Sequence, residues 1–245
     1  MNSKPNILVI TATYNEAQNI SAIIEQVLIQ NHNADMLVID DNSPDGTSGI
    51  VSDLIDRKEF NGRLYLISRP SKLGYGTAFI EGFSFGISNK KYDCFVSMDA
   101  DFSHDPSYIK TMADKLNDCD IIIGSRYIKG GGTRNWGIHR RILSRFANLY
   151  SRLILGMKVA DCTSGFRCYR RNVIESIDFK NITSTGYSFL EELIYLCKLK
   201  RFTMQEIPII FVDRKLGKSK ICRKEIFKAM ANVPLMRLKE LLRSK

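Results

Sequence analysis

The chain of 245 residues lacks any apolar run of the roughly 18 residues that a membrane-spanning helix needs. Its first residues lead directly into a strand-like segment, without the apolar stretch of a secretory leader. Its six cysteines are scattered and form no C-x-x-C pair, so they predict reduced thiols in a core rather than disulfides. We therefore expect a cytoplasmic protein with no membrane span.

The sequence also lacks helix-turn-helix, zinc-finger and RNA-recognition signatures, although its formal net charge is +10. Residues 1–125 carry 10 Lys and Arg against 17 Asp and Glu, a balance of −7. Residues 126–245 carry 26 against 9, a balance of +17. An acidic half with candidate metal-binding carboxylates, followed by a basic half, predicts a phosphorylated substrate or an anionic surface rather than nucleic acid.

Two carboxylates one residue apart follow the apolar run 94–98. Residues i and i+2 of a strand share one face, so Asp99 and Asp101 are expected to point the same way where the strand ends. Paired carboxylate oxygens suit Mg²⁺ or Mn²⁺, which completes its coordination with water and substrate phosphate. Taken alone, the pair is equally typical of a solvated surface turn.

Short β-rich runs alternate with helical patterns over residues 1–125, which predicts an α/β domain with a mainly parallel sheet covered by helices on both faces. After residue 125 this alternation stops. A glycine triplet at 130–132 predicts a flexible loop, and 224–242 is typical of an amphipathic helix that Pro234 strains in its middle or splits in two. The predicted strands are 6–10, 36–39, 63–67, 94–98, 120–124 and 202–210, and the other predicted helices are 17–30, 47–57, 76–88, 106–116, 139–155 and 189–199.

Residues able to bind a ligand follow four consecutive strands. They are the segments 11–16, 40–47 and 68–78 and the two aspartates. In an open α/β sheet the ligand lies beyond the carboxyl ends of the strands. Each segment alone is also typical of a capped loop, but their repetition predicts one shared site, in which Asp41 accepts from a nucleoside and Lys72 contacts phosphate.

These motifs, taken together, resemble the inverting nucleotide-sugar glycosyltransferases of family 2, and in particular the branch that transfers mannose to polyprenol (dolichol) phosphate. The resemblance spans roughly residues 6–220. It rests on Tyr14-Asn15-Glu16, Asp40-Asp41-x-Ser43-x-Asp45-Gly46-Thr47, Lys72-Leu73-Gly74-x-Gly76-Thr77-Ala78, Asp99-Ala100-Asp101, Gly124-Ser125-Arg126-Tyr127, Thr163-Ser164-Gly165-Phe166-Arg167-x-Tyr169 and Phe211-Val212-Asp213-Arg214-x-x-Gly217-x-Ser219-Lys220.

The resemblance implies a GT-A fold over 1–220, with a nucleotide-sugar half at 1–125 and an acceptor half at 126–220, followed by a basic amphipathic helix at 221–245. It also implies roles for individual residues. Asp99 and Asp101 would hold Mg²⁺ or Mn²⁺ and the diphosphate, and Arg126, Arg214 and Lys220 would contact the donor and acceptor phosphates. The nucleotide pocket would be lined by Ala12, Tyr14, Glu16, Ile39, Asp41, Lys72 and Ala100.

Two positions depart from the family pattern. Ala12 stands where these enzymes often have proline, which changes loop stiffness. Ser103 stands where some members have a glutamine metal ligand. The third ligand of the metal ion would then be this weaker hydroxyl, a water molecule or the neighbouring His104. We favour a supporting or surface role for the histidine, because hard cations prefer oxygen.

The branch resemblance implies transfer of mannose from GDP-mannose to a polyprenyl monophosphate, giving a β-linked product. Such an acceptor is already anionic and needs no strong general base, so catalysis would rest on in-line positioning and charge neutralisation. Arg167, Arg170 and Arg171 are further available cations, of which the last two fit a solvated surface. The implied location is peripheral on the cytoplasmic face of a membrane, through residues 224–245, a small membrane subunit, or both.

Two alternatives stay open. In the first, the donor is UDP-glucose or UDP-N-acetylglucosamine and the acceptor is a glycan hydroxyl, with Glu191 or Glu192 as the base. In the second, the chain is a non-catalytic binding subunit, which the aspartate pair with Arg214 and Lys220 disfavours. The Q-x-x-R-W motif of processive polysaccharide synthases does not occur.

Overall fold

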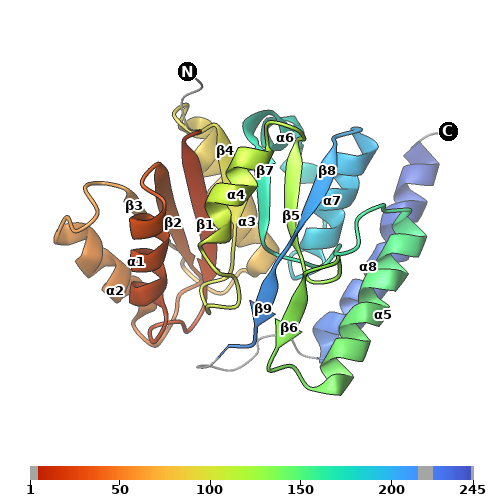
Figure 1. Cartoon of the computed structure of the whole chain (residues 1–245), viewed down its shortest axis with the longest axis horizontal. Helices are drawn as coiled ribbons and strands as arrows, with labels where there is room; N and C mark the ends of the chain where they lie inside the picture. Colours follow the sequence, from red (N-terminus) through yellow and green to blue (C-terminus); the bar gives the residue numbers. More distant parts are fainter. Residues whose placement is uncertain (1–4, 215–222, 244–245) are drawn as a thin grey trace.

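A computed structural model of the chain describes residues 5–214 and 223–243, and in its last helix the side chains of 230–240 only. Within these residues a seven-stranded sheet has the order β3-β2-β1-β4-β7-β5-β8, and a two-stranded sheet pairs β6 with β9 (Figure 1). The strands are β1 (Ile7–Thr13), β2 (Ala34–Asp40), β3 (Leu64–Ser68), β4 (Cys94–Ser97), β5 (Ile121–Ser125), β6 (Gly132–Arg134), β7 (Arg167–Arg170), β8 (Met204–Pro208) and β9 (Ile210–Val212).

Helices cover both faces of the large sheet, as the sequence predicts. One buried cluster joins the sheet to α1, α2 and α4, and the other joins it to α3, α6 and α7. The two longest helices, α5 and α8, lie against each other at one end of the molecule (Figure 1). The helices are α1 (Ile20–Gln30), α2 (Thr47–Asp56), α3 (Tyr75–Ser88), α4 (Tyr108–Lys115), α5 (Ile138–Leu155), α6 (Arg171–Ser176), α7 (Phe189–Leu199) and α8 (Arg223–Arg243), with a 3-10 turn at Phe179–Asn181.

Strands β1 to β4 are mutually parallel, so the segments that follow them meet at one edge of the sheet. Helix α3 approaches this sheet closely at Gly82, where a Cβ atom would lie 2.5 Å from Ile10 Cγ2. Any larger residue there would push the helix away from β1. The glycine therefore lets the middle of α3 pack closely on β1 and β2.

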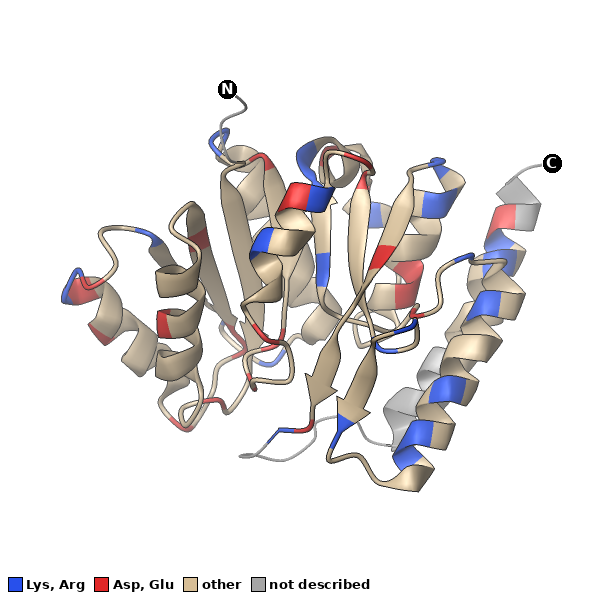
Figure 2. Ribbon diagram, in the orientation of Figure 1, with Lys and Arg blue, Asp and Glu red and all other residues tan. Residues whose placement is uncertain are grey.

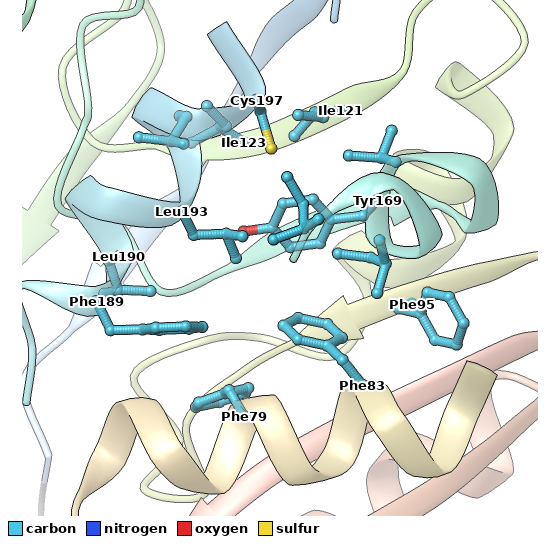
Figure 3. Close-up of a cluster of buried hydrophobic side chains, with 14 of the residues drawn as sticks. Phe79, Phe83, Phe95, Ile121, Ile123, Tyr169, Phe189, Leu190, Leu193 and Cys197 are labelled. Carbon is cyan, nitrogen blue, oxygen red and sulfur yellow. The ribbon is translucent and has the colours of Figure 1, made fainter. Parts of the chain in front are cut away.

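The second half of the chain enters the same sheet. Strand β7 lies antiparallel between β4 and β5, and β8 is parallel to β5. Residues 1–125 and 126–214 therefore contribute to one sheet and to the same two buried clusters. Aromatic side chains join them: the Phe83 ring lies 5.7 Å from the Tyr169 ring and 6.2 Å from the Phe95 ring, both edge-on (Figure 3).

Three details differ from the sequence-based expectations. Gly132, expected in a flexible loop, begins β6 and pairs with Ile210. The predicted strand 202–210 is two strands, β8 and β9, that belong to different sheets. Pro234 lies within α8, which is one continuous helix rather than two.

The five described cysteines are free and buried, as expected. None of the described helices is long and apolar enough to cross a bilayer.

Candidate functional site

The two aspartates lie where β4 ends, in the centre of the sheet. The Met98 N–H still donates to the Ile10 carbonyl at 3.1 Å, so the backbone remains tied to β1 up to the motif. Ala100 is buried between the aspartates, and all three residues line one cavity. The neighbouring strand thus fixes the direction in which both carboxylates point.

Asp99 is held from two sides. The Tyr75 hydroxyl donates to its Oδ1 at 3.1 Å, and its own backbone N–H donates to His104 Nδ1 at 3.0 Å. Burial raises the pKa of Asp99, and burial also lowers the pKa of His104, which stacks on Phe166 at 4.9 Å. His104 therefore uses Nδ1 to position the Asp99 backbone, which fits a supporting role.

Asp101 faces a cation of the chain itself. Its Oδ2 lies 3.0 Å from Arg214 Nη2, and its Oδ1 accepts the Ser103 backbone N–H at 3.1 Å. Burial opposes ionisation of Asp101, but the side chain and backbone N–H of Ser103 and the charge of Arg214 outweigh it and lower the pKa. Asp101 is therefore the carboxylate held in the charged form.

A cavity of about 300 Å³ opens beside this pair. Asp41 forms part of its wall, where its Oδ1 accepts from Arg69 at 2.6 Å and its Oδ2 accepts the Gly74 N–H at 3.0 Å. Gly74 has φ of +107°, which a larger residue adopts only with strain, so glycine is needed for this contact. Ile39 does not line the cavity: its side chain is fully buried and packs under α3.

Four other predicted residues line the same cavity. Ala12 lies near the end of β1, Tyr14 and Glu16 follow the strand, and the Glu16 carboxylate accepts from the Asn19 amide at 2.8 Å. Lys72 is exposed, and its Nζ lies 3.8 Å from the centre of the Tyr14 ring. The prediction that these strand ends converge is thus met geometrically, while the role of each residue stays a prediction.

A second cavity, of about 420 Å³, lies on the other side of Asp99. Arg126 forms part of its wall but is buried and paired in a fork with Asp161, with both guanidinium-to-carboxylate distances at 2.7 Å. The Arg126 charge is therefore balanced within the protein. Most of the remaining wall is apolar or aromatic and comes from α5, α7, α8 and β9: Leu143, Ala147, Tyr150, Leu190, Phe211, Met230 and Val233.

The two cavities meet at four shared residues, Tyr75, Asp99, Tyr187 and Arg214. The rings of Tyr75 and Tyr187 are stacked with their centres 4.7 Å apart. Neither tyrosine was identified as functional from the sequence. The available signal was the bulky Tyr75 between the two glycines of its motif; no local pattern marks Tyr187.

Several basic residues of the second half do not reach either cavity. Arg167 is fully buried and donates to the Leu190 and Cys162 carbonyls, both at 2.6 Å. The expectation of a solvated surface for Arg170 and Arg171 is wrong, because both are partly buried and donate to backbone carbonyls. These three arginines join segments of the fold. Lys220 lies outside the described residues.

The two glutamates at the start of α7 differ. Glu192 accepts the backbone N–H groups of Thr183 and Ser184, which ties it to the preceding loop. Glu191 is 6% exposed and lines the larger cavity, and burial raises its pKa to about 7. Only Glu191 is placed where it could exchange a proton with a ligand.

The donor set at the aspartate pair fits a Mg²⁺ or Mn²⁺ ion only in part. Among the described side chains, no third His, Cys, Asp or Glu joins Asp99 and Asp101. Two carboxylates at an open cavity are typical of a hard cation that takes its other ligands from water and substrate phosphates. Asp99, Asp101 and the Ser103 hydroxyl are the residues that would hold it.

Comparisons with known proteins identify the family of this chain. The model of "Glycosyl transferase family 2" matches residues 8–178. A polyprenol monophosphomannose synthase of Mycolicibacterium smegmatis is 40% identical over 92% of this chain and 84% of its own length. An undecaprenyl-phosphate mannosyltransferase of Micrococcus luteus is 35% identical over 93% of this chain and 92% of its own length.

Solved structures of low sequence identity share the fold. A mannosyltransferase of Pyrobaculum calidifontis in complex with GDP-Man and Mn²⁺ has a TM-score of 0.64 at 14% identity, covering 99% of this chain and 65% of that one. A glucosyl-3-phosphoglycerate synthase of Mycobacterium tuberculosis with Mn²⁺ and UDP has a TM-score of 0.65 at 18% identity, covering 96% of this chain and 79% of that one. This chain therefore belongs to glycosyl transferase family 2 and is a glycosyltransferase with a GT-A type fold.

Proposed function

We propose that this enzyme transfers mannose from GDP-mannose to a polyprenyl monophosphate, with inversion at the sugar and with Mg²⁺ or Mn²⁺ as cofactor. The observation that carries the proposal is the meeting, at Asp99, of a cavity lined by charged side chains with a largely apolar cavity. The names of the two curated relatives, both mannosyltransferases of polyprenyl phosphates, support the acceptor and the sugar.

The smaller cavity is assigned to the donor. Asp41 and Tyr14 would contact the nucleoside, Arg214 would face the donor phosphates, and Lys72 would stay on the Tyr14 ring. A divalent ion held by Asp99 and Asp101 would supply positive charge against the leaving diphosphate. Arg214 lies in the wall of both cavities, so its guanidinium can serve either phosphate.

The larger cavity is assigned to the acceptor. An acceptor phosphate oxygen attacks the anomeric carbon from the side opposite the donor diphosphate. The bond from that carbon to the diphosphate oxygen breaks, and GDP leaves with the electron pair. Because the attacking oxygen is already anionic, the site has only to align it, and Tyr75 and Tyr187 at the junction would orient the sugar. The apolar wall would contact the isoprenoid chain.

The decisive experiment is a donor screen with Mg²⁺ or Mn²⁺ and a short polyprenyl phosphate, following labelled sugar into the lipid product. GDP-mannose should give the main product, and its anomeric configuration should be β. Product from a UDP-sugar alone would contradict the donor, and no product from any donor would contradict the lipid-phosphate acceptor.

One observation favours a second candidate. Glu191 lines the larger cavity with a pKa of about 7, as a base for a hydroxyl acceptor would. Under this alternative, a glycan hydroxyl accepts the sugar and Glu191→Gln loses activity. Under the phosphate proposal, the same variant keeps transfer to polyprenyl phosphate.

The proposed location is peripheral, on the cytoplasmic face of a membrane, where the acceptor lipid resides. A small membrane subunit remains part of this proposal as a candidate partner. Co-purification of the enzyme from detergent-solubilised membranes would test that part separately from the chemistry.

A further inference from the structure

Apolar side chains are unusually exposed on one helix. Of the eleven large hydrophobic residues exposed in the described part of the chain, six belong to α5. Five of these follow helical spacing along one side, with exposed fractions from 51% to 73%: Ile138, Ile142, Phe146, Leu149 and Leu153. We call these five residues the α5 stripe. A contiguous apolar stripe of this kind marks an interaction surface rather than ordinary solvent-exposed helix.

The charges beside the α5 stripe are all of one sign. At 100° per residue, Arg141, Arg145 and Arg152 fall together along one edge of the stripe. The helix sequence Ile138–Leu155 contains no Asp or Glu. Figure 2 shows basic segments along the whole of α5. An apolar stripe with a basic edge is complementary to an anionic lipid surface.

The neighbouring helix also exposes apolar side chains. Helix α8 packs against α5, where the Tyr150 hydroxyl donates to the Met230 carbonyl at 2.9 Å. Leu235 and Leu238 of α8 are each 51% exposed. Leu143 and Tyr150 of α5 and Val233 of α8 line the larger cavity. The cavity wall and the exposed apolar surface are therefore built from the same two helices.

We propose that the α5 stripe is the surface by which this enzyme binds an anionic bilayer, with the apolar side chains inserted among the headgroups and the arginines facing lipid phosphates. If the larger cavity takes a polyprenyl phosphate, as proposed above, this orientation brings the cavity wall to the membrane. The sequence led us to expect attachment through residues 224–245, a small membrane subunit, or both; this proposal places the main contact with the bilayer on α5.

The test measures flotation of the full chain with vesicles of phosphatidylcholine, alone or mixed with phosphatidylglycerol. The triple variant Ile142→Ser, Leu149→Ser, Leu153→Ser removes three stripe residues that do not line the cavity. We expect its binding to mixed vesicles to fall at least about tenfold. The matched control is Ile29→Ser on α1, which is 56% exposed and remote from α5, and it should bind like the wild type.

A second variant tests the basic edge. Arg141→Gln with Arg145→Gln should remove the preference for phosphatidylglycerol while leaving weak binding to phosphatidylcholine. Circular dichroism and thermal unfolding of every variant should match the wild type, because the substituted side chains are exposed.

Three results would overturn the proposal: unchanged vesicle binding by the triple variant, equal loss in the Ile29 control, or a wild-type dimer without lipid that the triple variant converts to a monomer. The last would make the stripe an interface between two copies.

Activity measurements distinguish a failure of this proposal from a failure of the proposed function. The triple variant should keep transfer to a short acceptor in solution and lose it with a vesicle-embedded one. Stripe-dependent binding without any transfer to a polyprenyl phosphate would overturn the function alone.

Discussion

The two cavities use charge in different ways. In the smaller cavity, the carboxylates of Asp41 and Asp101 each accept a backbone N–H, face one arginine and still lie in the cavity wall. In the larger cavity, charges are paired across long stretches of sequence: Arg126 with Asp161, and Arg140 with Asp213. Several of the basic residues after residue 125 therefore join segments of the fold, either in ion pairs or through backbone carbonyls.

The difference teaches how to interpret a basic half-chain. A guanidinium such as that of Arg167, buried among carbonyls, would cost several kcal/mol to leave unpaired, so its partners show a structural role. Arg214 differs because it lies in the wall of both cavities and faces Asp101. Burial and partners separate the two kinds of arginine, whereas net charge does not.

The strongest test of the smaller cavity is Asp101→Asn. The amide keeps the shape but loses the charge that faces Arg214 and would bind a divalent ion, so turnover should fall about a thousandfold or more. Asp105→Asn is the matched control, since Asp105 is exposed in the same loop and caps Ser107. Steady-state kinetics with GDP-mannose measure both. Similar rates in the two variants would remove Asp101 from the chemistry.

The corresponding test of the larger cavity is Glu191→Gln. The pKa of Glu191 is raised from 4.5 to about 7, so the folded state binds this proton more tightly than the unfolded state. The free energy of unfolding should then fall as pH rises from about 4.5 to about 7, by roughly 3 kcal/mol at most. The glutamine variant lacks this loss, so its stability relative to wild type should improve over that range.

Urea unfolding at a series of pH values measures the difference. A constant difference between wild type and Glu191→Gln would show that the carboxyl is ionised equally easily in both states. The same variant assayed with a hydroxyl acceptor and with polyprenyl phosphate separates the two candidate functions.

The next test asks whether Arg214 serves a ligand or only neutralises Asp101. Arg214→Ala should raise the KM for the phosphorylated substrates about ten- to hundredfold, and Arg214→Lys should recover part of the loss, because lysine keeps the charge without the fork. Arg134→Ala, on the exposed side of β6, is the control. An unchanged KM in Arg214→Ala would assign the arginine to Asp101 alone.

The fold around the smaller cavity could be predicted from the sequence because its signals are local. Each parallel strand is a short apolar run followed at once by polar residues, and the sheet brings those ends together. Thus Glu16, Asp41, Asp99 and Asp101 were correctly expected to converge. Ile39 was expected in the pocket wall but packs under α3 instead. Nothing in an apolar strand shows which residue faces the ligand and which faces a helix.

The larger cavity could not be predicted in the same way. Strand β7 has only four residues, Arg-Cys-Tyr-Arg, and is fixed by pairing with β4 and β5 from the first half. The Tyr75–Tyr187 stack joins residues from α3 and a distant loop. These contacts depend on tertiary packing, which local periodicity does not encode.

The smallest expected effect is at Lys72, where the two sources of information disagree about the partner. The sequence predicts contact with phosphate, whereas the structure places Nζ 3.8 Å from the centre of the Tyr14 ring. An exposed cation–π contact contributes about 1 kcal/mol or less, so Lys72→Ala should raise the donor KM by no more than about fivefold. Lys90→Ala, also exposed but distant from the cavity, is the control. A hundredfold rise confined to Lys72→Ala would mean that the lysine leaves Tyr14 to bind phosphate when the donor is present. The Tyr14 ring would then hold this positive charge in the smaller cavity until substrate binds.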